Sequence, residues 1–378
     1  MHRSLITLCL LAAWLLAGCA AESPPFDSPP HLAWTYAAGG AIHQPPLVIG
    51  DQVIVAPAGG PLIALEAQTG RVRWQYDPPT GLWERAVAGD DRRLFVGLKG
   101  GSVAALEAGS GRVLWQQAVG IESQVPALVY DDILYVPTTF VGPELAADVP
   151  GRAQVLALDA RTGRRIWAFE TGNYILQTPE RRRNVLYVGG NFSDPRPIDE
   201  GGHVRIYALD AANASVRWIY EAEDGFPKRL YATADTLVFV GYQDFLNGVD
   251  AAAGALRWRR DTGNWTPTFL GAGDAIFSSA ANTTVARLHA DSGEAVWQFN
   301  IPGGSFNYLL GAAALQDGIL VFLTQQGDIH ALDAATGESL WHLATGVAAA
   351  RTGLSLGDGW LYFGDAEGVV YAYMSSDR

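Results

Sequence analysis

Cysteine is nearly absent from this sequence, which contains only Cys9 and Cys19 among its 378 residues. Both precede position 20, so no disulfide can form within the rest of the chain. Small secreted domains often rely on disulfides for stability. Here the folded part of the chain must instead be stabilised by packing.

Basic residues are scarce as well. Lys and Arg number 26 against 39 Asp and Glu, which gives a formal net charge of −13 at pH 7. Nucleic-acid binding depends mainly on Lys and Arg contacts to phosphates, and anionic lipid also attracts basic surfaces. The charge therefore argues against nucleic acid as a partner and against a body that lies flat on an anionic membrane.

Motifs that carry chemistry are also missing. The chain has no HExxH motif and no phosphate-binding Gly loop. The sequence therefore predicts no catalytic residue, no metal site and no bound cofactor, which favours a non-enzymatic protein. The histidines show no metal-ligand spacing, and we expect surface or turn positions for His43, His203, His289, His330 and His342.

A run long enough to span a bilayer is lacking, because the apolar stretch 5–16 falls short of the roughly 20 residues required. Arg3 precedes this stretch and small residues follow it, as in a secretory signal. The sequence LAGC at its end resembles the bacterial lipobox, in which the Cys is acylated and the chain is cleaved before it. We therefore expect residues 1–18 to be a signal peptide and Cys19 to carry acyl chains such as palmitate. An ordinary signal peptide with a chance Cys is the alternative.

Residues 19–30 follow as a segment rich in Pro and Ser. Such a composition disfavours helix and gives a semi-extended tether, with a reach of about 30 Å at ~3.1 Å per residue. Ala20 follows the Cys. By resemblance to sorted lipoproteins, Ala20 implies the outer membrane in an organism with two membranes, with the body facing the periplasm.

One template recurs seven times along the chain. A copy has an apolar strand, usually an acidic residue, a small turn with Gly, and a second strand that ends in Trp. The acidic side chain can accept bonds from N–H groups two residues on, and Gly suits a positive φ. Ala214 replaces the Gly in the fourth copy, so that turn could differ. The copies are IALEAQTGRVRW, AALEAGSGRVLW, LALDARTGRRIW, YALDAANASVRW, NGVDAAAGALRW, ARLHADSGEAVW and HALDAATGESLW.

A second hairpin lies between successive copies, as in PALVYDDILYVPT at 126–138. Two hairpins give four antiparallel strands in roughly 40 residues, which is the size of a propeller blade. The chain begins with a lone Trp strand at 31–40 and ends with a third strand at 368–373. We therefore predict an all-β fold over residues 31–378, an eight-bladed β-propeller of four-stranded antiparallel blades. The strand of Trp34 should complete the last blade; a seven-bladed ring with an extra hairpin is the alternative.

Eight tryptophans occupy one position of the template. Each buries roughly 150–250 Å², and their repetition around a ring favours a structural role between blades over a binding site. This predicted structural ring consists of Trp34, Trp74, Trp115, Trp167, Trp218, Trp258, Trp297 and Trp341.

The connections from each Trp strand to the next blade should return to the mouth of the central channel. In five of the eight connections an aromatic residue follows a Gly, and polar residues come shortly after it. Because aromatic and Arg side chains make binding hot spots, a binding ring is one interpretation, and packing against neighbouring blades is the other. Two long insertions, 138–153 and 190–203, should extend the same face, either as a docking patch or as plain surface. The candidate residues are Trp83, Arg85, Tyr174, Gln177, Phe226, Lys228, Arg229, Trp265, Phe306, Asn307 and Arg351.

The pattern ALDAATG followed by Trp resembles the PQQ-like, or tryptophan-docking, propeller repeat over about residues 31–373. Two families share this repeat. The quinoprotein alcohol dehydrogenases hold pyrroloquinoline quinone and Ca²⁺ on the propeller axis, and the BamB lipoproteins are non-enzymatic components of outer-membrane barrel assembly. The chain lacks the adjacent-Cys disulfide of the dehydrogenases and is much shorter. It agrees with the BamB family in size, blade count and lipid anchor.

Three hypotheses on function stay open. The resemblance favours a non-enzymatic envelope scaffold, anchored through Cys19, that binds envelope or outer-membrane proteins. A ligand-binding or redox propeller would need carboxylates near the axis, and a carbohydrate-binding propeller would use the aromatic ring. The nearest carboxylates do not form a convincing Ca²⁺ set: they are Glu84, Glu122 and Glu180.

Overall fold

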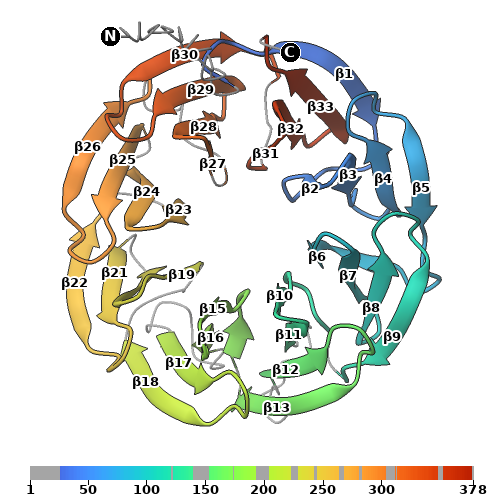
Figure 1. Cartoon of the computed structure of the whole chain (residues 1–378), viewed down its shortest axis with the longest axis vertical. Helices are drawn as coiled ribbons and strands as arrows, with labels where there is room; N and C mark the ends of the chain where they lie inside the picture. The colour runs from blue at the N-terminus through green and yellow to red at the C-terminus, as the bar shows by residue number, and fades with distance from the viewer. Residues whose placement is uncertain are drawn as a thin grey trace, which may run out of the picture.

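The chain folds into a ring of antiparallel β-sheets. The computed structural model describes residues 26–120, 122–138, 153–172, 174–192, 204–222, 229–241, 245–263, 268–280, 283–303, 311, 313–347 and 352–376. Over these residues the chain forms 33 β-strands in eight sheets. None of the described residues belongs to a helix long and apolar enough to cross a membrane. Figure 1 shows the sheets arranged as blades around a central axis, so the predicted eight-bladed β-propeller is confirmed.

The blades are numbered in chain order, and their strands run from the innermost to the outermost position. The first four blades are blade 1 with β2 (Leu47–Ile49), β3 (Gln52–Val55), β4 (Leu62–Glu66) and β5 (Val72–Tyr76); blade 2 with β6 (Leu82–Gly89), β7 (Arg93–Leu98), β8 (Ser102–Glu107) and β9 (Val113–Ala118); blade 3 with β10 (Leu128–Tyr130), β11 (Ile133–Thr138), β12 (Ala153–Asp159) and β13 (Arg165–Gly172); and blade 4 with β14 (Tyr174–Leu176), β15 (Glu180–Arg182), β16 (Val185–Phe192), β17 (Val204–Asp210) and β18 (Val216–Ala222).

The other four blades follow the same order. They are blade 5 with β19 (Leu230–Ala232), β20 (Thr236–Val240), β21 (Phe245–Asp250) and β22 (Leu256–Asp261); blade 6 with β23 (Phe269–Ala272), β24 (Ala275–Ala280), β25 (Thr284–His289) and β26 (Ala295–Asn300); blade 7 with β27 (Ala314–Gln316), β28 (Ile319–Leu323), β29 (Asp328–Asp333) and β30 (Ser339–Ala344); and blade 8 with β31 (Ser355–Gly357), β32 (Trp360–Gly364), β33 (Val369–Met374) and β1 (His31–Ala37).

The two ends of the chain close the ring. β1 pairs antiparallel with β33, with His31 opposite Met374 and Tyr36 opposite Val370. The N-terminal strand is therefore the outermost strand of blade 8, as the sequence predicted. Because the first strand is held by the last, the ring cannot open without breaking this pairing.

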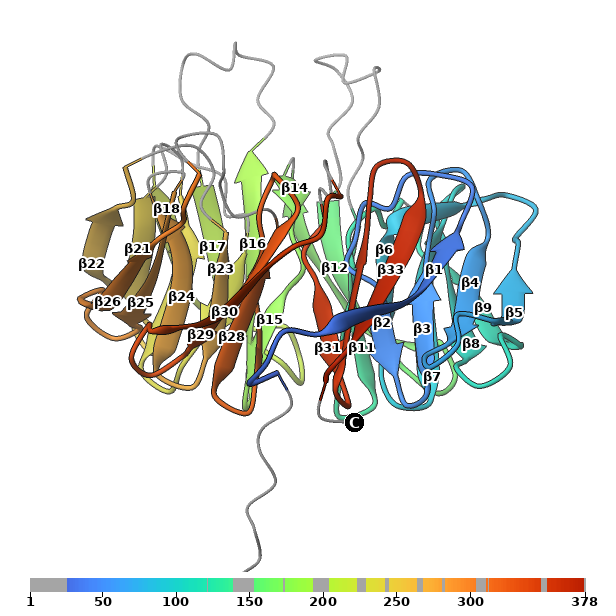
Figure 2. The ribbon, with the colours of Figure 1, turned by 90° about the horizontal axis from the view of Figure 1, so that it is seen from above.

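The ring has two faces that carry different connections. Within a blade, the turn between the first and second strands lies beside the turn between the third and fourth strands. In blade 1, for example, the Ala67 N–H of the β4–β5 turn donates to Asp51 O of the β2–β3 turn at 2.9 Å. We call this side the turn face. The second-to-third loops lie beside the connections between blades, where the Lys99 N–H donates to Gly81 O at 3.1 Å, and we call this side the connection face. Figure 2 shows the ring from its edge, with β16 rising to one face and the C-terminus at the other.

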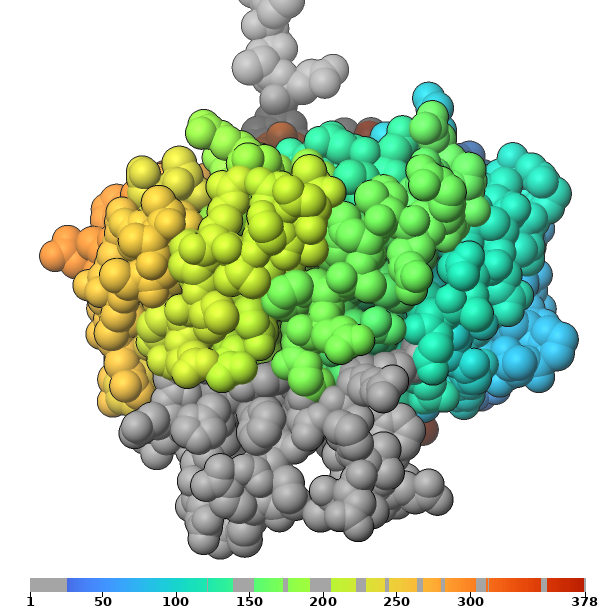
Figure 3. All heavy atoms as spheres, turned by 90° about the horizontal axis from the view of Figure 1, so that it is seen from below, coloured from blue at the N-terminus to red at the C-terminus, as the bar shows by residue number. Residues whose placement is uncertain are grey.

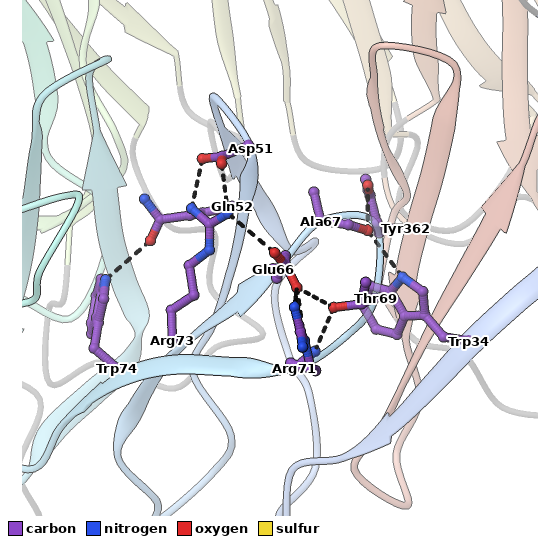
Figure 4. A network of polar contacts seen from close by, with 10 residues as sticks. All are labelled: Trp34, Asp51, Gln52, Glu66, Ala67, Thr69, Arg71, Arg73, Trp74 and Tyr362. Atoms are coloured by element: carbon purple, nitrogen blue, oxygen red, sulfur yellow. Dashed lines mark hydrogen bonds and ion pairs between the residues drawn. The ribbon is translucent and has the colours of Figure 1, made fainter. Parts of the chain in front are cut away.

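Each indole of the tryptophan ring reaches the next blade through one backbone carbonyl. Trp34 Nε1 donates to Ala67 O at 2.9 Å, in the residue that follows the acidic position of the template. Figure 4 shows this junction of blades 8 and 1, where Tyr362 OH is a second donor to Ala67 O at 3.1 Å. The same bond joins Trp74 to Ala108, Trp115 to Ala160, Trp167 to Ala211, Trp218 to Ala251, Trp258 to Ala290 and Trp297 to Ala334.

The hydrophobic core is divided among the junctions between neighbouring blades. The described residues form eight apolar clusters, and each takes buried side chains from two adjacent blades. Between blades 1 and 2, for example, Ile54 and Leu62 pack with Leu94 and Val96. Figure 3 shows the side wall that results, in which the outer strands of neighbouring blades abut from blade 2 to blade 5.

The turn after the acidic residue keeps one backbone shape in the fourth copy of the template. Gly163 has a φ of 73° and donates its N–H to Asp159 O at 2.8 Å. Ala214 has a φ of 61° and donates to Asp210 O at 2.8 Å, so the expectation that its turn could differ is wrong. Ala214 thus adopts the left-handed conformation that Gly adopts more readily.

Blade 7 meets blade 8 in another way, because blade 8 has no turn between its third strand and β1. Trp341 Nε1 donates to Phe26 O at 2.6 Å. The Phe26 side chain is fully buried in the apolar cluster of blades 7 and 8. Ser376 Oγ donates to Pro29 O at 2.7 Å. The segment before β1 therefore takes the place of the missing turn.

Candidate functional site

The predicted channel-mouth residues are only partly covered by the structure. Trp83, Arg85, Gln177 and Arg229 are described, as is the backbone of Tyr174. The remaining candidates, the lipidation site and most of both insertions lie outside the described residues: Phe226, Lys228, Trp265, Phe306, Asn307, Arg351, Cys19, 139–152 and 193–203.

Trp83 and Arg85 lie in an irregular part of β6, the innermost strand of blade 2. The pairing of β6 with β7 shifts between Leu82 and Val87, so these residues bulge out of the ladder. A bulge re-aims side chains and is common beside functional sites. The Lys99 ammonium lies 5.3 Å from the centre of the Trp83 ring, a cation–π contact across the connection face. Trp83 Nε1 is shielded from solvent and has no acceptor within the described chain.

Gln177 lies where the innermost strand of blade 4 is interrupted. β14 and β15 both pair with β16, and the Gln177 N–H donates to Gly189 O at 3.1 Å between them. Pro179 follows and has no N–H to continue the ladder. The interruption places Gln177 at the inner wall of the ring.

Glu180 and Arg229 lie at the inner edges of neighbouring blades and influence each other electrostatically. Glu180 opens β15, and Arg229 directly precedes β19 in the next blade. Burial raises the pKa of Glu180 to about 7, against weaker opposing effects of the Ala232 N–H, 3.4 Å from Glu180 Oε1, and of Arg229. Arg229 is exposed to solvent. Nearby protein atoms still desolvate its guanidinium, and this lowers its pKa. A carboxyl that titrates near neutrality on an inner wall is a candidate for function.

Arg181, next to this pair, has a structural role between blades 3 and 4. Its guanidinium stacks on the Tyr130 ring at 4.2 Å from the centroid, and its Nη1 donates to Tyr130 O at 3.3 Å. It also lies 3.6 Å from the Asp131 carboxylate. These contacts engage the guanidinium at the turn face.

The carboxylates proposed for an axial Ca²⁺ do not converge in the part of the chain that the structure describes. Glu122 accepts from the Gly100 N–H at 3.3 Å and from Gln124 Nε2 at 3.1 Å, so it braces a loop of the connection face. Glu84 lies on β6 of blade 2 and Glu180 on β15 of blade 4, and within the described residues neither joins Glu122 in a cluster of ligand atoms. The chain also has no Cys beyond position 19 to stack on a quinone. These residues do not fit a quinone–Ca²⁺ centre.

One serine motif needs its structural context. Residues 353–357 read G-L-S-L-G, which matches the G-x-S-x-G spacing of a nucleophile elbow. Ser355 instead begins β31 and pairs with Tyr362 in a hairpin, whereas an elbow joins a strand to a helix. Ser355 and Gln44 are the polar residues of an otherwise apolar pocket of about 220 Å³ between the inner strands of blades 8, 1 and 2. This volume lies below the range of ~300–1,000 Å³ that is usual for ligand pockets.

The expectation of a surface position is wrong for His330. Its side chain is 2% exposed and stacks on Phe322, with ring centroids 5.2 Å apart. Within the described residues it belongs to the one cluster of at least three His, Cys, Asp or Glu side chains whose ligand atoms come together, with Asp328 and His342. Sequence spacing missed this cluster because a β-hairpin register, and not a short motif, brings the histidines together.

With the geometry established, comparison with known proteins identifies the family. A family model described as outer membrane protein assembly factor BamB matches residues 28–124, 99–230 and 201–358. The chain belongs to this family. The matched segments run from the segment before β1 into blade 8, so the membership concerns the whole ring and not one blade.

Two relatives of this BamB-family chain illustrate its spread. The outer membrane protein assembly factor BamB of Moranella endobia is 25% identical over 234 residues, which cover 58% of this chain and 59% of that protein. The serine/threonine-protein kinase AfsK of Streptomyces coelicolor is 27% identical over 220 residues, which cover 56% of this chain and 24% of the kinase. The chain therefore spans less than two thirds of either relative.

Solved structures share the fold over nearly the whole ring. BamB from Moraxella catarrhalis superposes with a TM-score of 0.65 at 21% identity, covering 93% of this chain and 99% of that one. A quinohemoprotein alcohol dehydrogenase from Pseudomonas putida gives a TM-score of 0.65 at 14% identity, covering 92% and 76%. At these identities the likeness concerns the fold alone.

Proposed function

We propose that this BamB-family protein is a non-enzymatic scaffold lipoprotein of the cell envelope that takes part in outer-membrane protein assembly. The observation that carries the proposal is the match of the family model from residue 28 to residue 358. A closed ring with a core at every junction suits a scaffold, because it presents a broad surface that packing keeps rigid.

The position of the N-terminal segment supports a defined orientation on the membrane. Phe26 and Pro29 are held beside blade 8, and β1 begins where β33 ends, on the turn face. A tether from an acylated Cys19 would therefore reach the ring from the turn face. The connection face would point away from the lipid surface.

The connection face is the proposed partner surface. Both long insertions start and end there, since they join β11 to β12 and β16 to β17. Trp83 lies on the same face in contact with Lys99, and Trp is a residue type found in binding hot spots. Barrel-assembly proteins of the outer membrane are the partners that the family membership suggests.

An affinity pull-down from detergent-solubilised envelopes tests the proposal. The wild-type chain should recover barrel-assembly components, identified by mass spectrometry, whereas Cys19→Ala should recover fewer because it lacks the anchor that concentrates it at the membrane. Recovery of no specific protein by the wild-type chain would contradict the scaffold role. Titration with pyrroloquinoline quinone and oligosaccharides would then test the ligand-binding alternatives.

A further inference from the structure

Two histidines and an aspartate of blade 7 meet on one face of its outer hairpin. His330 of β29 lies directly opposite His342 of β30 in the antiparallel register. Asp328 lies two residues before His330 on β29, so the pleat places both side chains on the same face of the strand. Opposed and alternate positions of this kind are direct neighbours in a sheet. One ligand atom from each of the three residues lies within 4.8 Å of the others.

The His330 imidazole has a nitrogen that the protein leaves unused. The side chain is only 2% exposed, and its Nε2 has no hydrogen-bond partner within the described chain. Phe322 stacks on the ring, and the Phe299 ring of blade 6 lies 5.9 Å from it. A buried polar atom without a partner is costly, so Nε2 is available to a ligand.

The other two residues stand beside the His330 ring at the solvent boundary. The His342 ring centroid lies 4.6 Å from that of His330, and the His342 side chain is 49% exposed. His342 Nε2 lies 3.6 Å from Asp328 Oδ1. Rotation of these outer side chains can bring all three donor atoms within ~2.0–2.2 Å of one ion, the bond length that Zn²⁺ requires. His330 meanwhile stays fixed by its aromatic neighbours.

The chemistry of the donors selects the class of ion. A neutral imidazole binds a metal ion through a ring nitrogen, and the buried His330 has one that no protein group uses. Two imidazole nitrogens and one carboxylate suit Zn²⁺, Cu²⁺ or Ni²⁺, whereas Ca²⁺ and Mg²⁺ prefer sets of oxygen ligands. The exposed side of His342 leaves room for water in the remaining coordination positions.

We propose that His330, His342 and Asp328 form a binding site for a divalent transition-metal ion of the Zn²⁺ and Cu²⁺ class on the rim of blade 7. The site lies at the junction with blade 6, so a bound ion would fix the outer strand β30 against β29. This inference is independent of the proposed scaffold role.

Zn²⁺ calorimetry on the full chain, purified without a histidine tag, tests the site. Wild type should bind one equivalent, and His342→Gln and Asp328→Asn should each weaken binding at least ~10-fold, the lower end of what loss of a supporting contact costs at metal sites. His289→Gln, an exposed histidine of blade 6, is the matched control and should bind as wild type does. With Cu²⁺, electron paramagnetic resonance should show two nitrogen ligands in wild type and one in His342→Gln.

A further variant separates metal binding from folding. Blade 3 has Leu156 at the template position of His330, so His330→Leu should pack in the same core and keep the metal-free melting temperature within a few degrees. It should lose Zn²⁺ binding. Absence of binding in wild type, or equal affinity in His330→Leu and wild type, would overturn the proposal.

Discussion

At the scale of single residues, the repeat is explained by the small residue that follows the acidic one. The Ala67 N–H bonds the first-to-second turn of its own blade, and its carbonyl accepts from the indole of the preceding blade. Ala67 is 6% exposed, so a larger side chain would find little room. The pattern of an acidic residue, Ala and a later Trp therefore encodes one joint, in which a turn and a neighbouring blade share a peptide group.

The turn at Ala214 allows a direct test of backbone strain. Ala214→Gly should raise the free energy of unfolding by about 1 kcal/mol, because Gly adopts a φ of 61° without the cost that a Cβ imposes. The reverse change, Gly163→Ala, should destabilise, since its Cβ would lie 2.7 Å from the Trp115 indole. Chemical denaturation of both variants checks this. A loss of stability in Ala214→Gly would contradict the account.

The buried carboxyl of Glu180 predicts a pH dependence of stability. Its pKa rises from the ordinary value of 4.5 to about 7 in the folded protein, so the folded state binds the proton more tightly than the unfolded state. The stability that this group contributes is therefore present below pH ~4.5 and is lost as the pH rises through ~7. Glu180→Gln stays neutral and should gain on the order of 2 kcal/mol relative to wild type between pH 4 and pH 8.

Urea denaturation at a series of pH values measures this difference. Glu338→Gln, on an exposed turn of blade 7, is the matched control. Parallel pH profiles of wild type and Glu180→Gln would show that the Glu180 carboxyl titrates in the folded state as it does in the unfolded chain.

At the scale of elements, the closure of the ring depends on more than one strand. β1 supplies the last strand of blade 8, and the sequence predicted it from the lone Trp34 strand. The sequence did not predict that Phe26 would leave the tether and enter the core of blades 7 and 8. A single Phe in a Pro-rich segment follows no periodicity, and only the geometry of the closed ring shows the gap that it fills.

Loss of this contact should weaken the junction between blades 7 and 8. Phe26→Ala should lower the free energy of unfolding by about 3–5 kcal/mol, because it empties a site in which the side chain is 0% exposed. Leu32→Ala removes a side chain that is 50% exposed on the neighbouring β1 and should change stability by less than ~0.5 kcal/mol. Thermal and urea unfolding compare the two. Equal effects would mean that Phe26 does not close the ring.

The same scale explains what could be predicted from sequence. The blade count followed from the template because its tryptophans, apart from Trp341, repeat the same hydrogen bond, as Trp167 to Ala211 and Trp218 to Ala251 show. The candidate site at the connection face rests on residues that differ from blade to blade, so no repetition supported it. The cluster of His330 and His342 escaped prediction because its proximity depends on strand register across a turn.

At the scale of the whole molecule, the ring places the described N-terminal segment and the ends of the long insertions on opposite faces. The N-terminal segment is fixed at the turn face, whereas the insertions and the Trp83–Lys99 contact belong to the connection face. The eight clusters that join the blades keep these faces in a fixed relation. A membrane-tethered ring of this kind would hold one surface toward its partners.

Site-specific photo-cross-linking in intact cells tests this central claim most directly. A photo-reactive residue at Lys99, exposed on the connection face, should cross-link to outer-membrane assembly proteins. The same residue at Gln68, exposed in a turn of the turn face, should not. Cross-links to such proteins from Gln68 alone, or from neither position, would contradict the account that the connection face is the partner surface.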